Sequence, residues 1–148
     1  MSPTRTHRAA RGEGSRGQGL VEFALIAPIL ILLLVAIFDV GRLVFAYNDI
    51  TNAARVGTRV AIVDQGNNNA RTATIGQATS LGLANGDVTV TYLTSDLSKA
   101  CPVPYQLGCV AKVQARFQWQ AITPIIGNIM GPITVTTNSV MPIERIFP

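Results

Sequence analysis

A long apolar segment near the N-terminus constrains this chain more than any other feature. From Leu20 to Phe38 the only charged residue is Glu22. About 19 helical residues at roughly 1.5 Å each extend about 28 Å, close to the thickness of the hydrocarbon core of a bilayer. The sequence therefore predicts one transmembrane helix over about residues 20–38.

The positive charge of the chain is concentrated before this segment. The net charge is +4 over 148 residues. The charged residues before Gly17 are Arg5, Arg8, Arg11, Glu13 and Arg16. They carry +3 and leave +1 for the rest, so we expect the N-terminus to stay in the cytoplasm and the C-terminal part to be exported. Because most of the positive charge lies before Gly17, no nucleic-acid partner is indicated.

Export would place both cysteines of the chain in an oxidising compartment. Cys101 and Cys109 are the only two, and such a setting favours a disulfide between them. On the chain-entropy model, closing so short a loop contributes about 2 to 3 kcal/mol. Two unpaired thiols are the alternative.

The sequence divides into three regions. Residues 1–17 are a basic leader that we expect to be disordered, residues 18–62 a long helix, and residues 63–148 an extracytoplasmic head. The helix continues past the membrane because apolar residues recur at helical spacing. These are Val40, Leu43, Val44, Tyr47, Ile50, Ala54, Gly57 and Ala61. Turn-forming residues 64–69 end it.

Three small residues four apart, Ala53, Gly57 and Ala61, form a flat strip on this helix. Such a strip lets another backbone approach closely. It can pack against the sheet of the same chain or against the helix of a neighbouring subunit, and the sequence leaves both open.

The sequence of the head predicts a small domain that contains both helices and strands. A short, weak helix is expected over residues 71–81, strands over 88–92 and 111–120, a helical turn between Pro124 and Pro132, and a last strand from Ile133. The fold class is therefore α+β. One long N-terminal helix packs through its second half on a mainly antiparallel sheet of about three strands.

Glu22 is the residue that most needs an explanation, because an ionised carboxylate in hydrocarbon costs a few kcal/mol. If the chain is cut after Gly17, Gln18 gains an α-ammonium group a few residues away, and pairing of the two charges would offset that cost. Alternatively, the carboxylate reaches the headgroups.

The stretch from Gly17 through Gln18 and Glu22 to Phe23 resembles the processing site of prepilins of the tight-adherence (Tad/Flp) branch of type IV pili. Gly ends the leader, Glu is fifth in the mature chain and an aromatic residue follows. With Ala24 to Pro28, Gly41 to Leu43 and Thr51 to Gly57, the chain resembles TadE-like pseudopilins over roughly residues 16–61.

This resemblance implies a pilin-like fold and a minor pseudopilin that acts as a structural or assembly component. It implies cleavage after Gly17 by a prepilin peptidase, and anchoring in the plasma (inner) membrane with the head outside, as a component that can join a cell-surface pilus. The implied partners are that peptidase, other pilin or pseudopilin subunits, inner-membrane platform proteins and membrane lipid.

Pro28 lies inside the predicted span and removes the helical hydrogen bond to the carbonyl of Ala24. We expect a kink or loosening there. It either lets the helix adjust during extraction from lipid or is simply tolerated near the start of a membrane helix.

Catalytic chemistry is not indicated. The sole histidine, His7, lies in the leader, so the exported part has no histidine for a triad or a metal site. Asp64, Asp87 and Asp96 lie among turn residues and are expected to be solvated or capping. We therefore expect no enzyme activity, metal, cofactor or small-molecule substrate.

Two other classes of function remain open. One is a membrane-anchored adhesin or binding module that uses the loop from Cys101 to Cys109, for which exposed aromatic side chains near Tyr105 would be support. The other is an uncleaved single-pass envelope protein. A conventional signal peptide fits less well, because the apolar run is long and no small-x-small cleavage pattern follows it.

Overall fold

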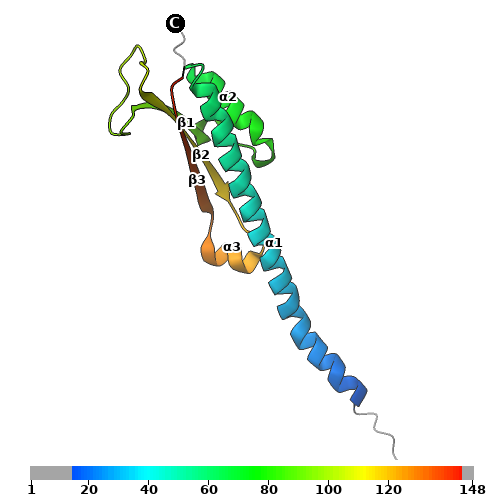
Figure 1. Ribbon diagram of the computed structural model, residues 1–148. Helices are drawn as coiled ribbons and strands as arrows, with labels where there is room; N and C mark the ends of the chain where they lie inside the picture. Colours follow the sequence, from blue (N-terminus) through cyan, green and yellow to red (C-terminus); the bar gives the residue numbers. More distant parts are fainter. Residues whose placement is uncertain (1–14, 145–148) are drawn as a thin grey trace, which may run out of the picture.

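The computed structural model describes residues 15–144, and its longest element is the N-terminal helix α1 (Ser15–Ala61). Figure 1 shows the first half of α1 projecting away from the head and the second half lying along the sheet. Residues 15–17, assigned to the leader, are helical. Residues 1–14 of that leader lie outside the described residues.

The apolar first half of α1 is the part that can cross a membrane. None of its most apolar window is buried within the molecule. Within residues 15–144, α1 is the one helix that is long and apolar enough for such a span. The predicted span, residues 20–38, lies within this half of α1.

A three-stranded sheet forms the head. After α1 come α2 (Asn67–Gln77), two 3-10 turns (Thr79–Leu81 and Asn85–Asp87), β1 (Val88–Thr94), β2 (Cys109–Trp119), α3 (Pro124–Met130) and β3 (Ile133–Pro142). The strand order is β1-β2-β3, and both pairs are antiparallel. The predicted α+β fold is confirmed. The last strand is longer than its first apolar residues suggested.

One face of the sheet is buried. Ala111, Val113 and Ala115 of β2 are inaccessible to solvent, and the residues between them are partly exposed. On β1, Val88 and Val90 alternate in the same way. The predicted alternation is confirmed, and it turns the apolar face toward the second half of α1.

The buried side of α1 differs in part from the expected one. Its buried residues are Asp39, Ala46, Ile50, Ala53, Ala54, Gly57, Thr58 and Ala61. The prediction that Val40, Val44 and Tyr47 share the buried face is wrong, since all three are exposed. Apolar residues occupy two sides of α1 here, and the side with small residues packs inward because it lets the helix approach the sheet closely.

Candidate functional site

The predicted processing residues lie at the free end of α1. Gly17, Gln18, Glu22 and Phe23 are all exposed. A Cβ added at Gly17 would meet no atom within 4 Å outside its own helical turn. The bond between Gly17 and Gln18 lies in the first turn of the helix, where backbone groups lack intrahelical partners and helix ends fray. The site is therefore open to an enzyme.

The Glu22 carboxylate lies beside residue 18. Gln18 Nε2 donates a hydrogen bond to Glu22 Oε1 at 3.4 Å, across one helical turn. Among the side chains that the structure describes, which begin at residue 17, no cationic side chain forms an ion pair with Glu22. The helix thus brings the acid close to the residue that would carry a new amine after cleavage.

Pro28 lies well inside α1, and the helix is continuous on both sides of it. The missing N–H leaves the carbonyl of Ala24 without its usual donor. A local loosening there stays a prediction.

The strip of small residues is buried inside the chain itself. Ala53, Gly57 and Ala61 are buried. A Cβ added at Gly57 would lie 1.9 Å from Thr74 Oγ1 and 3.1 Å from the carbonyl oxygen of Ala70, both in α2. At Gly57 the close neighbour is thus α2, rather than the sheet or a second subunit.

Asp39, the first residue after the span, is the most densely bonded acid of the head. Its carboxylate accepts hydrogen bonds from the amide of Ile122 at 3.0 Å and from the amide and hydroxyl of Thr123 at 3.0 and 2.6 Å. It is only 3% exposed. Arg42 Nη1 adds a contact at 3.4 Å from its half-exposed side chain, which contributes little. These bonds fix the segment before α3 to α1 where the helix leaves the span.

The bonds to Asp39 also change its acidity. The hydroxyl of Thr123, followed by the amides of Ile122 and Thr123, lowers the pKa of the Asp39 carboxyl to about 2, because these donors stabilise the ionised form. Asp39 is therefore charged throughout the physiological pH range.

The two cysteines form the expected disulfide, with Cα atoms 6.0 Å apart. The ring of Tyr105 lies in the closed loop and contacts the ring of Tyr92, with centroids 4.4 Å apart. Burial raises the pKa of Tyr92 to about 12. Tyr105 is half-buried, so it is not the exposed aromatic residue that an adhesive loop was expected to present.

The three acids that were expected to be solvated or capping, Asp64, Asp87 and Asp96, stabilise turns. Asp64 accepts a hydrogen bond from the amide of Gly66 at 2.8 Å, and Asp87 accepts one from the amide of Ala84 at 2.8 Å. Asp96 bonds to Thr94 and Ser98, and these bonds lower its pKa to about 2. Within residues 15–144, no group of three or more His, Cys, Asp or Glu side chains could hold a metal ion.

Sequence reasoning assigned no role to Asp39, although a signal was available. Asp39 precedes Ala46 by seven residues and Ile50 by eleven, which are helical offsets that place all three on one face. Its partners, however, lie more than eighty residues away in the chain. Periodicity can place Asp39 on the buried face but cannot name those partners.

A long N-terminal helix that can cross a membrane packs through its second half on a small antiparallel sheet, an arrangement consistent with a membrane-anchored, pilin-like protein. Residues 17–59 match the model of the TadE family, described as TadE-like protein. The match over this segment confirms the resemblance drawn from the sequence. Proteins of this family are typically structural components of a pilus system. Neither the curated proteins nor the solved structures contain a match.

Proposed function

We propose that this protein is a pseudopilin that serves as a structural or assembly component of a Tad-type pilus or secretion apparatus. In this proposal α1 anchors it in the plasma membrane and the head lies outside. The observation that carries the proposal is that the TadE match over residues 17–59 coincides with α1. That helix begins with the ordered set Gly17, Gln18, Glu22 and Phe23.

The mechanism is assembly by exchange of lipid contacts for protein contacts. Residues 20–38 expose apolar side chains all round, so the span is solvated by lipid in the free subunit and by other pilin helices in an assembly. Val40, Val44 and Tyr47 extend this apolar surface beyond the membrane. A neighbouring subunit or an inner-membrane platform protein is the partner we expect there.

Glu22 sets the register of that assembly. After cleavage the α-ammonium group of Gln18 lies one helical turn from the Glu22 carboxylate, and it can pair with Glu22 of its own chain or of a neighbour. A neighbour in the wrong register leaves one charge unpaired in a medium of low dielectric constant, which is costly.

The second candidate, an adhesive head, has less support. Tyr105 packs on Tyr92 instead of standing free. Of the apolar side chains in the disulfide-closed loop, Val103 and Leu107 are well exposed. Two scattered aliphatic side chains are ordinary on a protein surface.

N-terminal sequencing of the protein recovered from membranes tests the processing step. We expect Gln18 as the first residue. Gly17→Ala should block or slow cleavage, whereas Gly19→Ala is the matched control, because neither glycine has a neighbour that an added Cβ would meet. Recovery of Met1 from cells with an active prepilin peptidase would refute processing and favour the uncleaved envelope protein.

Substitution of Glu22 tests the assembly step. We expect Glu22→Gln and Glu22→Ala to insert into the membrane normally and to lose cross-linking to partner pilins. Because Glu22→Gln keeps the size of the side chain, a loss in that variant isolates the charge. Normal pilus formation by both variants would contradict the proposed role of Glu22.

A further inference from the structure

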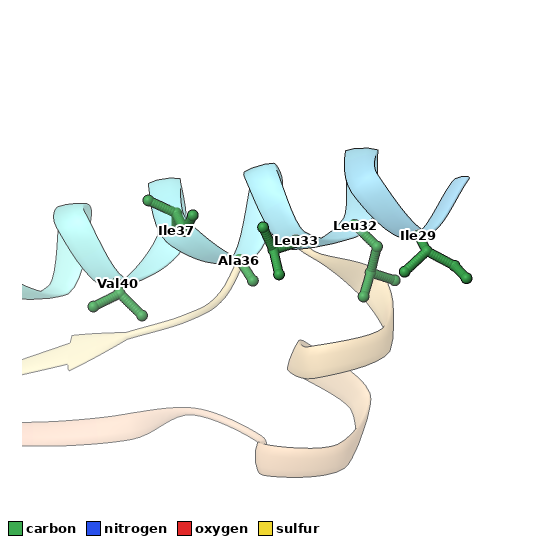
Figure 2. Close-up of a pocket in the computed structure, with 6 residues that line it drawn as sticks. All are labelled: Ile29, Leu32, Leu33, Ala36, Ile37 and Val40. Atoms are coloured by element: carbon green, nitrogen blue, oxygen red, sulfur yellow. The ribbon is translucent and has the colours of Figure 1, made fainter. Parts of the chain in front are cut away.

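An apolar groove runs along the outer half of the membrane span and just past its end, on the side where α3 lies. It has a volume of about 470 Å³ and is lined by Ile29, Leu32, Leu33, Ala36, Ile37 and Val40. At a rise of about 1.5 Å per residue, these positions cover roughly 16 Å of the helix. Figure 2 shows Leu32, Ala36 and Val40 directed toward the side on which α3 runs.

The bonds of Asp39 fix the height of α3 relative to the membrane. Because Ile122 and Thr123 are bonded to the first residue after the span, the chain enters α3 at the membrane surface. Both figures show α3 beside α1, and in Figure 2 it lies next to groove residues that belong to the span. This short helix therefore lies at the depth of the lipid leaflet next to the head.

Three large apolar side chains of α3 and its approach are exposed. Ile122 is 66% exposed, Ile129 79% and Met130 61%. From Phe117 to Ile143 the sequence contains no Asp, Glu, Lys or Arg. In water such side chains would form an unfavourable patch, whereas at the boundary of headgroups and acyl chains they gain about 25 cal/mol per Å² of buried apolar area.

We propose that α3 with Ile122 inserts into the bilayer leaflet next to the head and that phospholipid acyl chains fill the apolar groove of α1 on the side where α3 lies. The groove is continuous with the lipid-facing surface of the span, and this continuity favours lipid over another occupant. The inference rests on the membrane-spanning part of the proposed function and is independent of its pilus role and of its orientation. Insertion of α3 fixes the head upright on the membrane instead of leaving it free to tilt.

Depth-dependent quenching in phosphatidylcholine vesicles tests this inference on the full chain with its disulfide intact. Single cysteines carrying a fluorophore replace Ile31 in the span, Asn128 in α3 and Ser98 in the distal loop, all exposed positions. We expect deep acyl-chain quenchers to act best at residue 31, shallow ones at residue 128 and neither at residue 98. Absence of quenching at residue 31 would refute the span itself. If the fluorophore at residue 31 is quenched but the fluorophore at residue 128 is as little quenched as the one at residue 98, only the insertion of α3 is refuted.

A matched pair of charge substitutions tests the apolar contact. Ile129→Asp places a charge on α3, and Val103→Asp places one on the distal loop at the same exposed fraction, 79%. We expect Ile129→Asp to lower the shallow quenching at residue 128 to roughly half or less, and Val103→Asp to leave it unchanged. Equal effects of the two would overturn the inference. If two copies of the chain cross-link to each other at residue 128, and quenching at this residue decreases as the protein-to-lipid ratio is raised, the groove would instead be assigned to a second copy of the chain.

Discussion

The carboxylate of Asp39 joins α1 to the segment before α3, because it accepts hydrogen bonds from two backbone amides and one hydroxyl of that segment. A buried amide without an acceptor costs the full desolvation penalty of that group. Asp39→Asn would turn one acceptor oxygen into a donor facing other donors. We expect the Ile122 and Thr123 amides to exchange with deuterium on the order of tenfold faster in that variant. Asp96→Asn, which alters only a local turn, is the control and should leave both amides unchanged.

The acidity of Asp39 predicts a specific pH response. Its pKa in the folded protein is about 2, below the ordinary value of about 3.9 for Asp. Its stabilising contribution is thus complete above about pH 4 and is lost as the pH falls toward 2. The NMR shifts of the Ile122 and Thr123 amides should titrate with a midpoint near pH 2. A midpoint near pH 4 would mean that the carboxylate is not held by these donors.

At Gly57 the helices α1 and α2 approach closely, since an added Cβ would overlap the hydroxyl of Thr74. We expect Gly57→Ala to destabilise the head by about 1 to 3 kcal/mol. Urea unfolding followed by the fluorescence of the single, buried Trp119 measures this. Gly76→Ala in α2, where a Cβ meets nothing within 4 Å, should be neutral or stabilising by up to about 1 kcal/mol. Equal losses in both variants would argue against the close approach.

At the scale of elements, the β1–β2 connection is closed by the disulfide between Cys101 and Cys109. Breaking so short a loop should lower the free energy of unfolding by about 2 to 3 kcal/mol on the chain-entropy model. Melting of the oxidised and reduced protein measures the difference. A Cys101→Ser/Cys109→Ser variant should match the reduced protein and ignore reductant. If reductant still lowers the melting temperature of this variant, the loss of stability on reduction has a cause other than the disulfide.

Elements with a simple repeat could be predicted from the sequence, and those that depend on contacts far along the chain could not. The alternation in β2 requires one buried face, so Ala111 and Val113 were placed correctly. In the second half of α1, apolar residues on two sides left the buried face undecided. The side of α1 that carries Ala46 and Ile50 packs inward, because most of its buried side chains are small and allow close packing.

The candidate site divides in the same way. Gly17, Gln18 and Glu22 are close in sequence and lie in one helix, so their proximity follows from helical geometry alone. The hydrogen bonds between Asp39 and residues 122–123 depend on how the head folds back onto α1, and no local sequence pattern predicts them. The same holds for Gly57, whose neighbour proved to be α2.

For the whole molecule, the proposed orientation can be tested with the only two lysines, Lys99 and Lys112, both in the head. Lys99 is exposed. A membrane-impermeant amine reagent applied to cells with an opened outer envelope should label Lys99 and leave the N-terminal amine unlabelled. Inside-out vesicles should give the reverse, and a Lys99→Arg/Lys112→Arg variant gives the background. Labelling of Lys99 only in inside-out vesicles would reverse the orientation.

The continuity of α1 has a mechanical consequence. Its 47 residues form a rod of about 70 Å that carries both the anchor and one wall of the head. A rotation of the membrane-spanning half of α1 about the helix axis would therefore turn the head as well, because the helix is continuous from one to the other. A partner that binds the free half of α1 would in this way also set the direction that the head faces.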